Sequence, residues 1–421
     1  MTAGLLAFGG AAPAVAAPFR VASDAVTPNT WSLLGSLPER VQDPVFALGV
    51  DPSDDQRVLV GTSTGNVYRS ADGGWTWKQV GSKLGRGVLT FGFDPFRPGV
   101  VVAGTRGGGV WRSRDGGVSW QADPGSAPRT VRAFGFARQI TLAGTDAGLL
   151  ASRRGGPWTP AGLGQVAVSA VAVAAVTDPL QLVAGGDTTR GTEPLPLFDS
   201  GDGGQNWQLV EGAVGGSSMV SSLAAGPSAG GSRPLLMGTN TGLFSSSDDG
   251  IDWQAMTGSG GLPATDYTCL AFSATDPARF YVASDGGASA QGGLWSSADG
   301  GTQFRSLSPP VASVSAIAAS GDSEPVLYVA TFRPIDHAVM LWAYWDAGGA
   351  VRQPVGGVPT PATHRASATS TTARAQGEPA GAWWLVALMR GPEAPYLLLG
   401  LVAAIALALA AVAYARRTRS L

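Results

Sequence analysis

Short apolar runs recur in pairs along the chain, and a small polar turn separates the two runs of each pair. One unit reads VLVGT at 58–62 and NVYRS at 66–70, and a later unit reads LLMGT at 235–239 and GLFSS at 242–246. Brief runs rich in β-branched and aromatic residues, bounded by Gly and polar residues, are typical of β-strands. The pattern therefore predicts antiparallel β-meanders that repeat along the sequence.

An eight-residue cassette follows the second run of most units. It reads SADGGWTW at 70–77, SRDGGVSW at 113–120, SGDGGQNW at 200–207, SSDDGIDW at 246–253 and SADGGTQF at 297–304. A decayed and shorter copy, SRRGGPW, begins at Ser152, with Arg154 in the place of the Asp. The copies recur every ~40–50 residues, which is the length of one four-stranded propeller blade.

A seventh, degenerate unit follows the last cassette, with VLYVAT at 326–331 and LWAYWDAGG at 341–349. Seven such units predict an all-β fold, a seven-bladed β-propeller with four-stranded antiparallel blades over residues 30–354. Trp31 lies in strand-like text that has no cassette before it. We expect this N-terminal strand to join the last blade and close the ring, which removes two open sheet edges.

The cassette residues suit a structural role in a tight turn. The glycines permit positive φ angles, the carboxylate can accept backbone N–H groups within the turn, and the aromatic side chain can pack beneath it. We therefore predict that these residues are structural and not catalytic. They are Ser70, Asp72, Gly74, Trp77, Ser113, Asp115, Gly117, Trp120, Ser200, Asp202, Gly204, Trp207, Ser246, Asp248, Gly250, Trp253, Ser297, Asp299, Gly301 and Phe304.

The cassettes resemble the Asp-box, or BNR, repeats of sialidase-like β-propellers, and the resemblance covers about Trp31 to Pro354. It implies that each box joins the third and fourth strands of a blade at the outer rim. In size and repeat text the chain is similar to photosystem II stability/assembly factor-like proteins and related BNR-repeat proteins. That resemblance implies a noncatalytic, protein-binding propeller on the outer or lumenal side of a membrane.

The same superfamily includes enzymes, so the alternative is a sialidase-like or other glycoside hydrolase, or a carbohydrate-binding propeller, at the cell surface. Sialidases use a Tyr nucleophile paired with Glu. Tyr68, Tyr281 and Tyr328 lie in repeated strand text without such a Glu. The nearest text to the Phe-Arg-Ile-Pro motif of sialidases is FRPI at 332–335, which differs in order and follows all the boxes. The sequence favours binding over catalysis, and we assign no catalytic residue.

Candidate contact residues lie in the variable loops between the second and third strands of three units. Such loops gather at one mouth of a propeller's channel, where rigid blades position them. The loops span 187–196, 285–293 and 332–338. Their candidate partner- or ligand-contact residues are Arg190, Glu193, Asp285, Arg333, Asp336 and His337.

The composition narrows the chemistry further. The formal net charge of −2 disfavours a nucleic-acid partner, which needs a basic face. The single cysteine, Cys269, allows no internal disulfide, and two histidines cannot form a Cys/His metal site. We therefore expect no metal and no cofactor. The expected partners are envelope or membrane proteins, with glycans as the alternative.

The C-terminal region predicts a membrane anchor. Residues 396–414 form an uncharged apolar run of the length that spans a bilayer as a helix. The basic tail at 415–421 predicts a cytoplasmic C-terminus by the positive-inside rule. Residues 355–382 are rich in Pro, Ala, Ser and Thr, and we expect a disordered stalk there.

The N-terminal residues 1–17 resemble a signal peptide that ends in an Ala-x-Ala site, although the usual basic n-region is lacking. The scarcity of Lys relative to Arg, with abundant Ala and Gly, is typical of a GC-rich bacterial genome. Together these features predict a single-pass cell-membrane protein with its propeller on the extracytoplasmic side. The predicted function is a protein-binding or assembly scaffold held at that membrane.

Overall fold

The computed structural model describes residues 26–187 and 194–348, except 213, 215, 229–230, 259–261, 264–265 and 287–291, and also residues 352–355. The predicted signal peptide, nearly all of the stalk, the predicted membrane helix and the basic tail lie outside the described residues. Within the part that is described, no helix has the length and apolar character needed to cross a bilayer.

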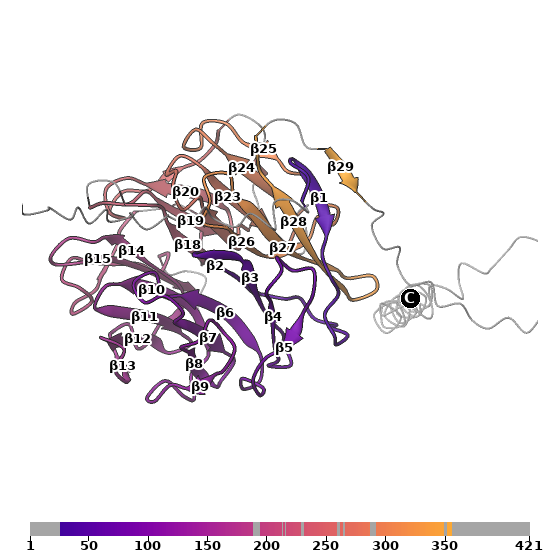
Figure 1. Ribbon diagram of the computed structural model, residues 1–421. Coiled ribbons are helices and arrows are strands. Elements are labelled where there is room, and N and C mark those ends of the chain that lie inside the picture. Colours follow the sequence, from indigo (N-terminus) through magenta and orange to yellow (C-terminus); the bar gives the residue numbers. More distant parts are fainter. Residues whose placement is uncertain are drawn as a thin grey trace, which may run out of the picture. The chain divides into compact units, whose positions relative to one another are not determined.

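The described part of the chain forms seven β-sheets, the blades, which follow one another along the sequence (Figure 1). Blade 1 contains β2 (Ala47–Asp51), β3 (Asp54–Gly61), β4 (Val67–Ser70) and β5 (Lys78–Gln79); blade 2 contains β6 (Val88–Phe93), β7 (Val101–Thr105), β8 (Gly109–Ser113) and β9 (Gln121–Ala122). Blade 3 contains β10 (Val131–Ala137), β11 (Ile140–Thr145), β12 (Gly148–Arg153) and β13 (Trp158–Pro160); blade 4 contains β14 (Ala167–Ala175), β15 (Gln181–Asp187), β16 (Leu197–Ser200) and β17 (Gln208–Leu209).

The remaining blades follow the same order. Blade 5 contains β18 (Val220–Ala225), β19 (Leu235–Thr239), β20 (Gly242–Ser246) and β21 (Gln254–Ala255); blade 6 contains β22 (Cys269–Phe272), β23 (Phe280–Ser284), β24 (Gly293–Ser297) and β25 (Arg305–Ser306). Blade 7 contains β26 (Val314–Ala319), β27 (Val326–Arg333) and β28 (Ala338–Trp345), with β1 (Thr30–Leu33) and β29 (Arg352–Val355) beside them.

Successive blades meet through their first strands, which lie innermost. β2 contacts β6, β6 contacts β10, and the series continues through β14, β18, β22 and β26. β26 in turn contacts β2, so the last blade meets the first and the ring is closed. These contacts and the sheet order confirm the predicted seven-bladed propeller of four-stranded antiparallel blades.

The N-terminal strand completes the last blade, as its place in the sequence predicts. β1 pairs antiparallel with β28, and Trp31 lies opposite Tyr344. Trp31 is fully buried, its ring centroid lies 4.8 Å from that of Tyr344, and its indole N–H donates to the Leu307 carbonyl at 2.7 Å. The first strand of the chain therefore holds the last blade, which leaves fewer open edges.

The seventh blade carries a fifth strand that the sequence did not predict. β29 pairs in parallel with β1 along its outer edge. It ends at Val355, the residue at which we expected the stalk to begin. Its text, RQPV, contains a proline, which strands tolerate at an edge. Because so short a segment shows no alternation, local pattern gives no strand signal here.

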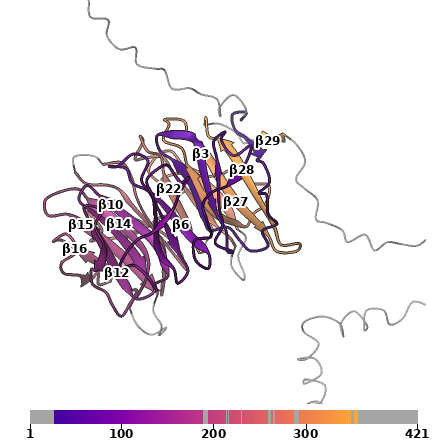
Figure 2. The same ribbon diagram turned by 60° about the horizontal axis from the view of Figure 1, so that its bottom comes forward.

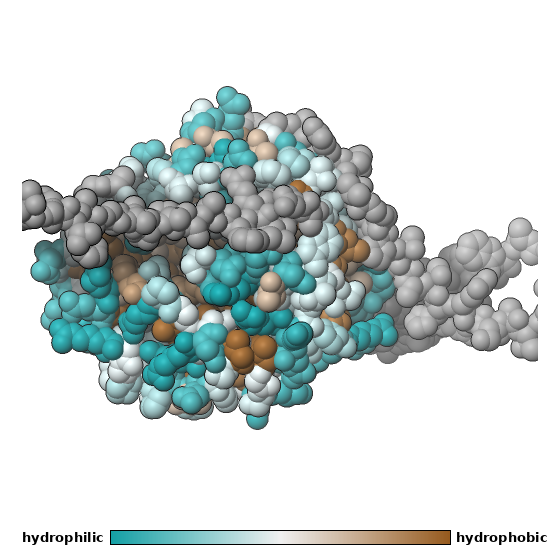
Figure 3. Space-filling model, viewed as in Figure 1, coloured by the Kyte–Doolittle hydropathy of each residue, from teal (hydrophilic) through white to brown (hydrophobic). Residues whose placement is uncertain are grey.

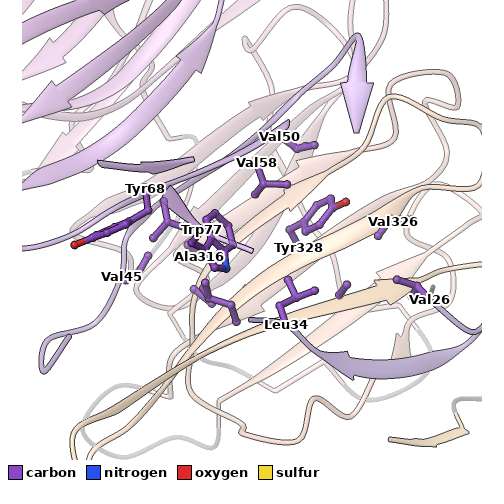
Figure 4. Close-up of a cluster of buried hydrophobic side chains, with 14 residues drawn as sticks. Val26, Leu34, Val45, Val50, Val58, Tyr68, Trp77, Ala316, Val326 and Tyr328 are labelled. Carbon is purple, nitrogen blue, oxygen red and sulfur yellow. The ribbon is translucent and has the colours of Figure 1, made fainter. Parts of the chain in front are cut away.

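The apolar core is divided among the blades. Among the described residues there are seven hydrophobic clusters, and each lies between two neighbouring blades. The cluster between blades 7 and 1 brings Val58 and Tyr68 together with Tyr328 and Val326, and Leu34 from the segment after β1 joins it (Figure 4). Each blade therefore buries both of its faces against its neighbours.

The repeated Gly-Thr at the end of the second strand has a separate reason for each residue. A Cβ atom at Gly104 would lie 2.8 Å from the Val131 carbonyl oxygen of the next blade, and one at Gly238 would lie 2.0 Å from the Tyr267 carbonyl oxygen. The glycine therefore lets neighbouring blades approach closely. The threonine is buried and bonds across the hairpin, as when Thr105 donates its hydroxyl at 2.8 Å to the carbonyl four residues later.

Candidate functional site

The two faces of the ring carry different loops. On one face, which we call the mouth face, lie the loops between second and third strands and the connections from one blade to the next. On the other, the box face, lie the loops between first and second strands and the boxes between third and fourth strands. The strands of neighbouring blades run side by side between these faces (Figure 2).

Each intact box closes its turn with its own serine and aspartate. In the first box, Ser70 Oγ donates to Asp72 Oδ1 at 2.7 Å and accepts the Gly74 N–H at 2.8 Å. Asp72 accepts the N–H and the hydroxyl of Thr76 at 2.9 and 2.5 Å. The serine–aspartate bond recurs at 2.7–2.9 Å in the four other intact boxes. The carboxylates are thus engaged within their own turns.

Hydrogen bonds keep the box carboxyl groups ionised. The backbone N–H and the side-chain amide of Asn206 hold the pKa of Asp202 at about 2. Burial raises the pKa of Asp115, but hydrogen bonds from Ser119 and Ser113 outweigh burial and bring that pKa to about 2. A carboxyl group with so low a pKa is a poor general acid near neutral pH. The electrostatics therefore favour a structural use of these groups.

The aromatic residue that ends each intact box fastens its blade to the preceding one. Trp77 donates its indole N–H to the Gly35 carbonyl, and Trp207 donates to the Ala161 carbonyl, both at 2.9 Å. In the other three intact boxes the aromatic ring lies in the hydrophobic cluster shared with the preceding blade. The box is therefore a joint between blades as well as a turn.

The decayed third box has lost its aspartate, and Arg154 does not replace it. Arg154 has a positive φ of 54°, and its N–H donates to the Gln139 carbonyl. In the first box this conformation and this bond belong to Gly73, whose N–H donates to the Gln56 carbonyl. Arg154 therefore stands in the place of the first glycine. The assignment of Arg154 to the Asp position was wrong, because the one-residue deletion shifts the alignment at that point.

A buried arginine from the neighbouring blade serves the third box instead. Arg112 donates to Ser152 Oγ at 3.4 Å and forms a salt bridge with Asp123 at 2.5 Å. Asp123 also accepts the indole N–H of Trp158, the aromatic residue of this box, at 2.8 Å. Because Arg112 is only 7% exposed, its charge needs such a partner. The network joins blades 2 and 3 where the box carboxylate is missing.

The structure describes four of the six candidate contact residues, and Arg190 and Glu193 lie outside the described residues. Arg333 and Asp336 form a two-point ion pair in the β27–β28 hairpin, at 2.9 and 2.8 Å. His337 follows with a φ of 53° and places its Nδ1 atom 3.2 Å from the Gln42 carbonyl oxygen. The hairpin therefore brings three of the candidates together on the mouth face.

The remaining candidate, Asp285, follows β23 in blade 6 on the same face. It belongs to a more acidic part of that face, where Asp266 accepts the Ser221 hydroxyl at 2.5 Å. Burial, with a smaller contribution from the Asp285 charge, raises the pKa of Asp266.

A hollow of about 230 Å³ opens on the mouth face close to the β27–β28 hairpin. Its lining includes Asp43, the residue after the Gln42 that His337 contacts, together with Phe46, Leu89 and Arg106. Phe46 is 50% exposed, and Ile335 at the hairpin tip is 81% exposed. On the face that Figure 3 shows, hydrophobic side chains form small patches between hydrophilic ones.

Sequence reasoning missed Phe46 and Leu89, because each lies in ordinary strand text. It also missed a buried cluster on the box face, where Asp346 accepts the Tyr281 hydroxyl at 2.9 Å and pairs with Arg305. Asp346 is 3% exposed and lies between blades 6 and 7, so the cluster ties the two blades together.

The five tyrosines between residues 26 and 348 are all buried, with at most 1% of each exposed. The hydroxyl groups of Tyr267 and Tyr328 donate to the carbonyls of Pro263 and Asp55, at 2.7 and 2.8 Å. Burial raises the pKa of Tyr344 to about 12. A tyrosine nucleophile must reach its substrate, and these side chains are enclosed between blades.

These observations define an Asp-box β-propeller with a structural rim and an exposed mouth face. No protein-family model and no curated protein matches the chain. Among solved structures, YCF48 from Cyanidioschyzon merolae is similar at 15% identity and a TM-score of 0.53, over 75% of this chain and 99% of that one. A structure of YCF48 bound to D1 peptide is 16% identical with a TM-score of 0.52, over 77% and 99%.

A third similar structure is the extracellular domain of the putative hybrid two component system BT3049 from B. thetaiotaomicron. It is 16% identical with a TM-score of 0.55, over 76% of this chain and 41% of that one. At such identities the likeness establishes the fold alone. At that level it agrees with the BNR-repeat resemblance read from the boxes.

Proposed function

We propose that the chain is a protein-binding or assembly scaffold, a membrane-anchored propeller on the extracytoplasmic side. This proposal rests on the contrast between the two faces. On the box face the carboxylates of the intact boxes are engaged within their own turns, while on the mouth face Arg106 has no ion pair among the described residues and lines one hollow together with the half-exposed Phe46. Exposed apolar side chains beside polar ones on a rigid frame are suited to a protein partner.

The similar fold of YCF48 bound to D1 peptide supports this use of the fold, since it pairs a propeller with a peptide ligand. The anchor in this proposal is the apolar run at 396–414, with the basic tail at 415–421 in the cytoplasm. The stalk at 355–382 then serves as the tether between the propeller and the anchor.

A glycosidase finds less support in the site. The tyrosines that a sialidase-type nucleophile would need are buried, and hydrogen bonds hold the pKa of the box carboxyl groups Asp115 and Asp202 at about 2. Activity of the full-length chain on sialosides or β-glucans, abolished by Arg333→Ala or Asp336→Ala, would overturn the scaffold proposal.

The direct test is co-purification of the tagged full-length chain from detergent-solubilised membranes after crosslinking. We expect one consistent protein partner, which is lost when residues 334–337 are replaced by a Gly-Ser turn. Ile251→Ser, which removes a 62% exposed side chain from the box face, serves as the matched control and should retain the partner. Failure to recover any consistent partner would contradict the proposal.

A further inference from the structure

In five of the seven blades the innermost strand carries a bulge at its mouth-face end. The pairing register with the second strand shifts at Val88/Thr90, Val131/Ala133, Val168/Ala170, Val220/Ser222 and Val314/Ala316. In each case the valine is buried, and the residue after it is the extra one. A bulge leaves that residue outside the ladder and can redirect its side chain.

In blade 1 the residues at the corresponding positions are Val45 and Phe46, which directly precede β2, where Ala47 pairs with Gly61. Val45 is fully buried, and its carbonyl accepts the Ser315 hydroxyl of blade 7 at 2.7 Å. In the same way the Val220 carbonyl of blade 5 accepts the Ser169 hydroxyl of blade 4. Phe46 is therefore the residue that corresponds to the extra one in the other blades.

The bulge residues of blades 4, 5 and 7 are serines that fasten one blade to the next. Ser169 donates to the Val220 carbonyl, Ser221 to Asp266 and Ser315 to the Val45 carbonyl. A small polar side chain at this position thus has a structural use. In these three blades the bulge residue therefore stabilises the contact with the next blade.

Blades 1 to 3 carry large side chains at the same position instead. They are Phe46, Leu89 and Arg132. Phe46 is half exposed, Leu89 is partly exposed, and Arg132 is exposed with no hydrogen bond or ion pair in the described part of the chain. The contacts that make the ring do not require these three side chains. Their presence on one continuous arc of three blades points to a ligand.

The loops of this arc hold the exposed residues together. The Leu84 N–H donates to the Gly65 carbonyl at 2.7 Å, and the Arg106 N–H donates to the Gly87 carbonyl at 2.9 Å. Phe46 and Leu89 line the same hollow, and Arg106 stands beside it. The hollow therefore offers an apolar wall with the Arg106 guanidinium group and the Asp43 carboxylate in its lining.

The charge of the arc is positive on balance. Lys83, Arg86, Arg106 and Arg132 are exposed and form no ion pair with any residue that the structure describes. The nearby acids accept hydrogen bonds from neutral groups and keep their negative charge. They are Glu39, Asp43 and Asp146, and the four cations outnumber them. A ligand of complementary charge is therefore anionic.

We propose that this arc is the contact surface for an extended peptide segment of a protein partner, in which a hydrophobic side chain lies next to carboxylates. The hydrophobic side chain enters the hollow between Phe46 and Leu89, and the carboxylates pair with Arg106 and Arg132. This assignment rests on the proposed scaffold function and names the partner chemistry of its mouth face. A single hollow suits one side-chain anchor better than a lipid surface, and the net charge of −2 disfavours nucleic acid.

The test is selection of short peptides from a random display library on the immobilised full-length chain in detergent. We expect the selected peptides to share Ile, Leu or Phe next to Asp or Glu. A synthetic peptide of that consensus should then bind, and Phe46→Ser or Arg106→Glu should weaken it about tenfold or more, as for a central anchor or a contacting charge. Binding should also weaken as salt is raised.

Matched controls make the same two changes on the box face. Ile251→Ser and Arg114→Glu alter exposed side chains there and should leave the affinity unchanged. Replacing the hydrophobic residue of the peptide by Ser tests the hollow without altering the protein, and it should cause a similar loss. Near-identical melting temperatures of the variants exclude misfolding as the cause.

Three results would overturn the assignment. They are selection of no such peptide, a consensus that lacks carboxylates, and an affinity that Phe46→Ser and Arg106→Glu leave unchanged. So would stronger binding to phosphatidylglycerol vesicles or to a DNA oligonucleotide through the same residues. Equal recovery of a membrane partner by wild type, Phe46→Ser and Arg106→Glu would show that the arc is not its contact surface. The scaffold function would still stand. Loss of every partner in the wild-type chain would instead overturn the scaffold function.

Discussion

Gly238 and Thr239 show what the repeated dipeptide does at the scale of single residues. Gly238 lets the Tyr267 carbonyl of the next blade approach, and Thr239 donates its hydroxyl to the Gly242 carbonyl at 3.2 Å. One residue therefore serves the interface between blades and the other serves its own hairpin. The pair recurs at 61–62, 104–105 and 144–145, and each of these threonines also donates to a carbonyl of its own hairpin.

We predict that Gly238→Ala destabilises the propeller by about 1–3 kcal/mol, because the new Cβ would lie 2.0 Å from a backbone oxygen that cannot rotate away. The free energy of unfolding from a urea titration measures this. Gly164→Ala is the matched control, since no heavy atom lies within 4 Å of its added Cβ. Equal stability of the two variants would contradict the close approach of the blades.

Asp115 should make the stability of its box depend on acid. Its folded pKa of about 2 lies below the ordinary value of about 4, so its ionised form stabilises the fold above about pH 4. That contribution is lost as the pH falls from about 4 towards 2. We expect Asp115→Asn to lower the melting temperature at pH 7. The difference in melting temperature from wild type should become smaller near pH 2.

The control for Asp115 is Glu211→Gln. The Glu211 side chain is exposed and makes no hydrogen bond or ion pair with the residues that the structure describes. Its substitution should shift the melting temperature little at either pH. A difference in melting temperature between Asp115→Asn and wild type that stays constant down to pH 2 would show that the stability of the box does not depend on the charge of Asp115.

At the scale of elements, the third blade shows that side chains of a neighbouring blade can stabilise a box that has lost its aspartate. Its own aspartate is missing, and the Arg112–Asp123 pair from blade 2 holds Ser152 and Trp158 instead. The blade therefore retains four strands despite the decayed text. The pair makes the joint between blades 2 and 3 unusually dependent on charge.

We predict that Arg112→Ala destabilises the propeller by about 3–5 kcal/mol, since it leaves a partly buried carboxylate without its partner. Arg69 occupies the corresponding strand position in blade 1, but it bonds the neutral Gly116 carbonyl at 3.1 Å. Arg69→Ala should therefore cost about 1 kcal/mol. Urea titration of both variants measures the difference, and equal losses would contradict a special role for the third-blade network.

The strands and boxes could be predicted from sequence because local text repeats with the period of a blade. The place of Trp31 predicted the closing strand, since an isolated strand must pair with something. By contrast, β29, the bulges and the true place of Arg154 depend on pairing between distant segments, which local text does not record. For the same reason Phe46 looked like an ordinary strand residue.

The order of the strands correctly predicted that Asp285, Arg333, Asp336 and His337 lie between the second and third strands of their blades. Arg333, Asp336 and His337 lie on the β27–β28 hairpin of the mouth face. Sequence could not show that Arg333 and Asp336 would pair with each other, because that depends on the hairpin's backbone. Whether they contact a partner stays a prediction.

At the scale of the whole molecule, the ring depends on the strand that closes it. Trp31→Ala should destabilise the propeller by about 3–5 kcal/mol, because it removes a fully buried ring and its bond to Leu307. Trp75→Ala at a box tip, where the side chain is 37% exposed, is the control and should change little. Equal unfolding free energies for the two variants would contradict closure through β1.

A closed ring with rigid blades can present its mouth face without rearrangement, which lowers the cost of binding an extended segment. The structural elements on the box face leave the mouth face free for a partner. We therefore propose that recognition occurs on the mouth face and not on the box rim.

The most direct measurement is photo-crosslinking in intact cells with benzoylphenylalanine placed at position 46, 335 or 251. We predict that positions 46 and 335 give an adduct with the same protein and that position 251 gives none. An adduct from position 251 alone, or none from positions 46 and 335, would contradict it.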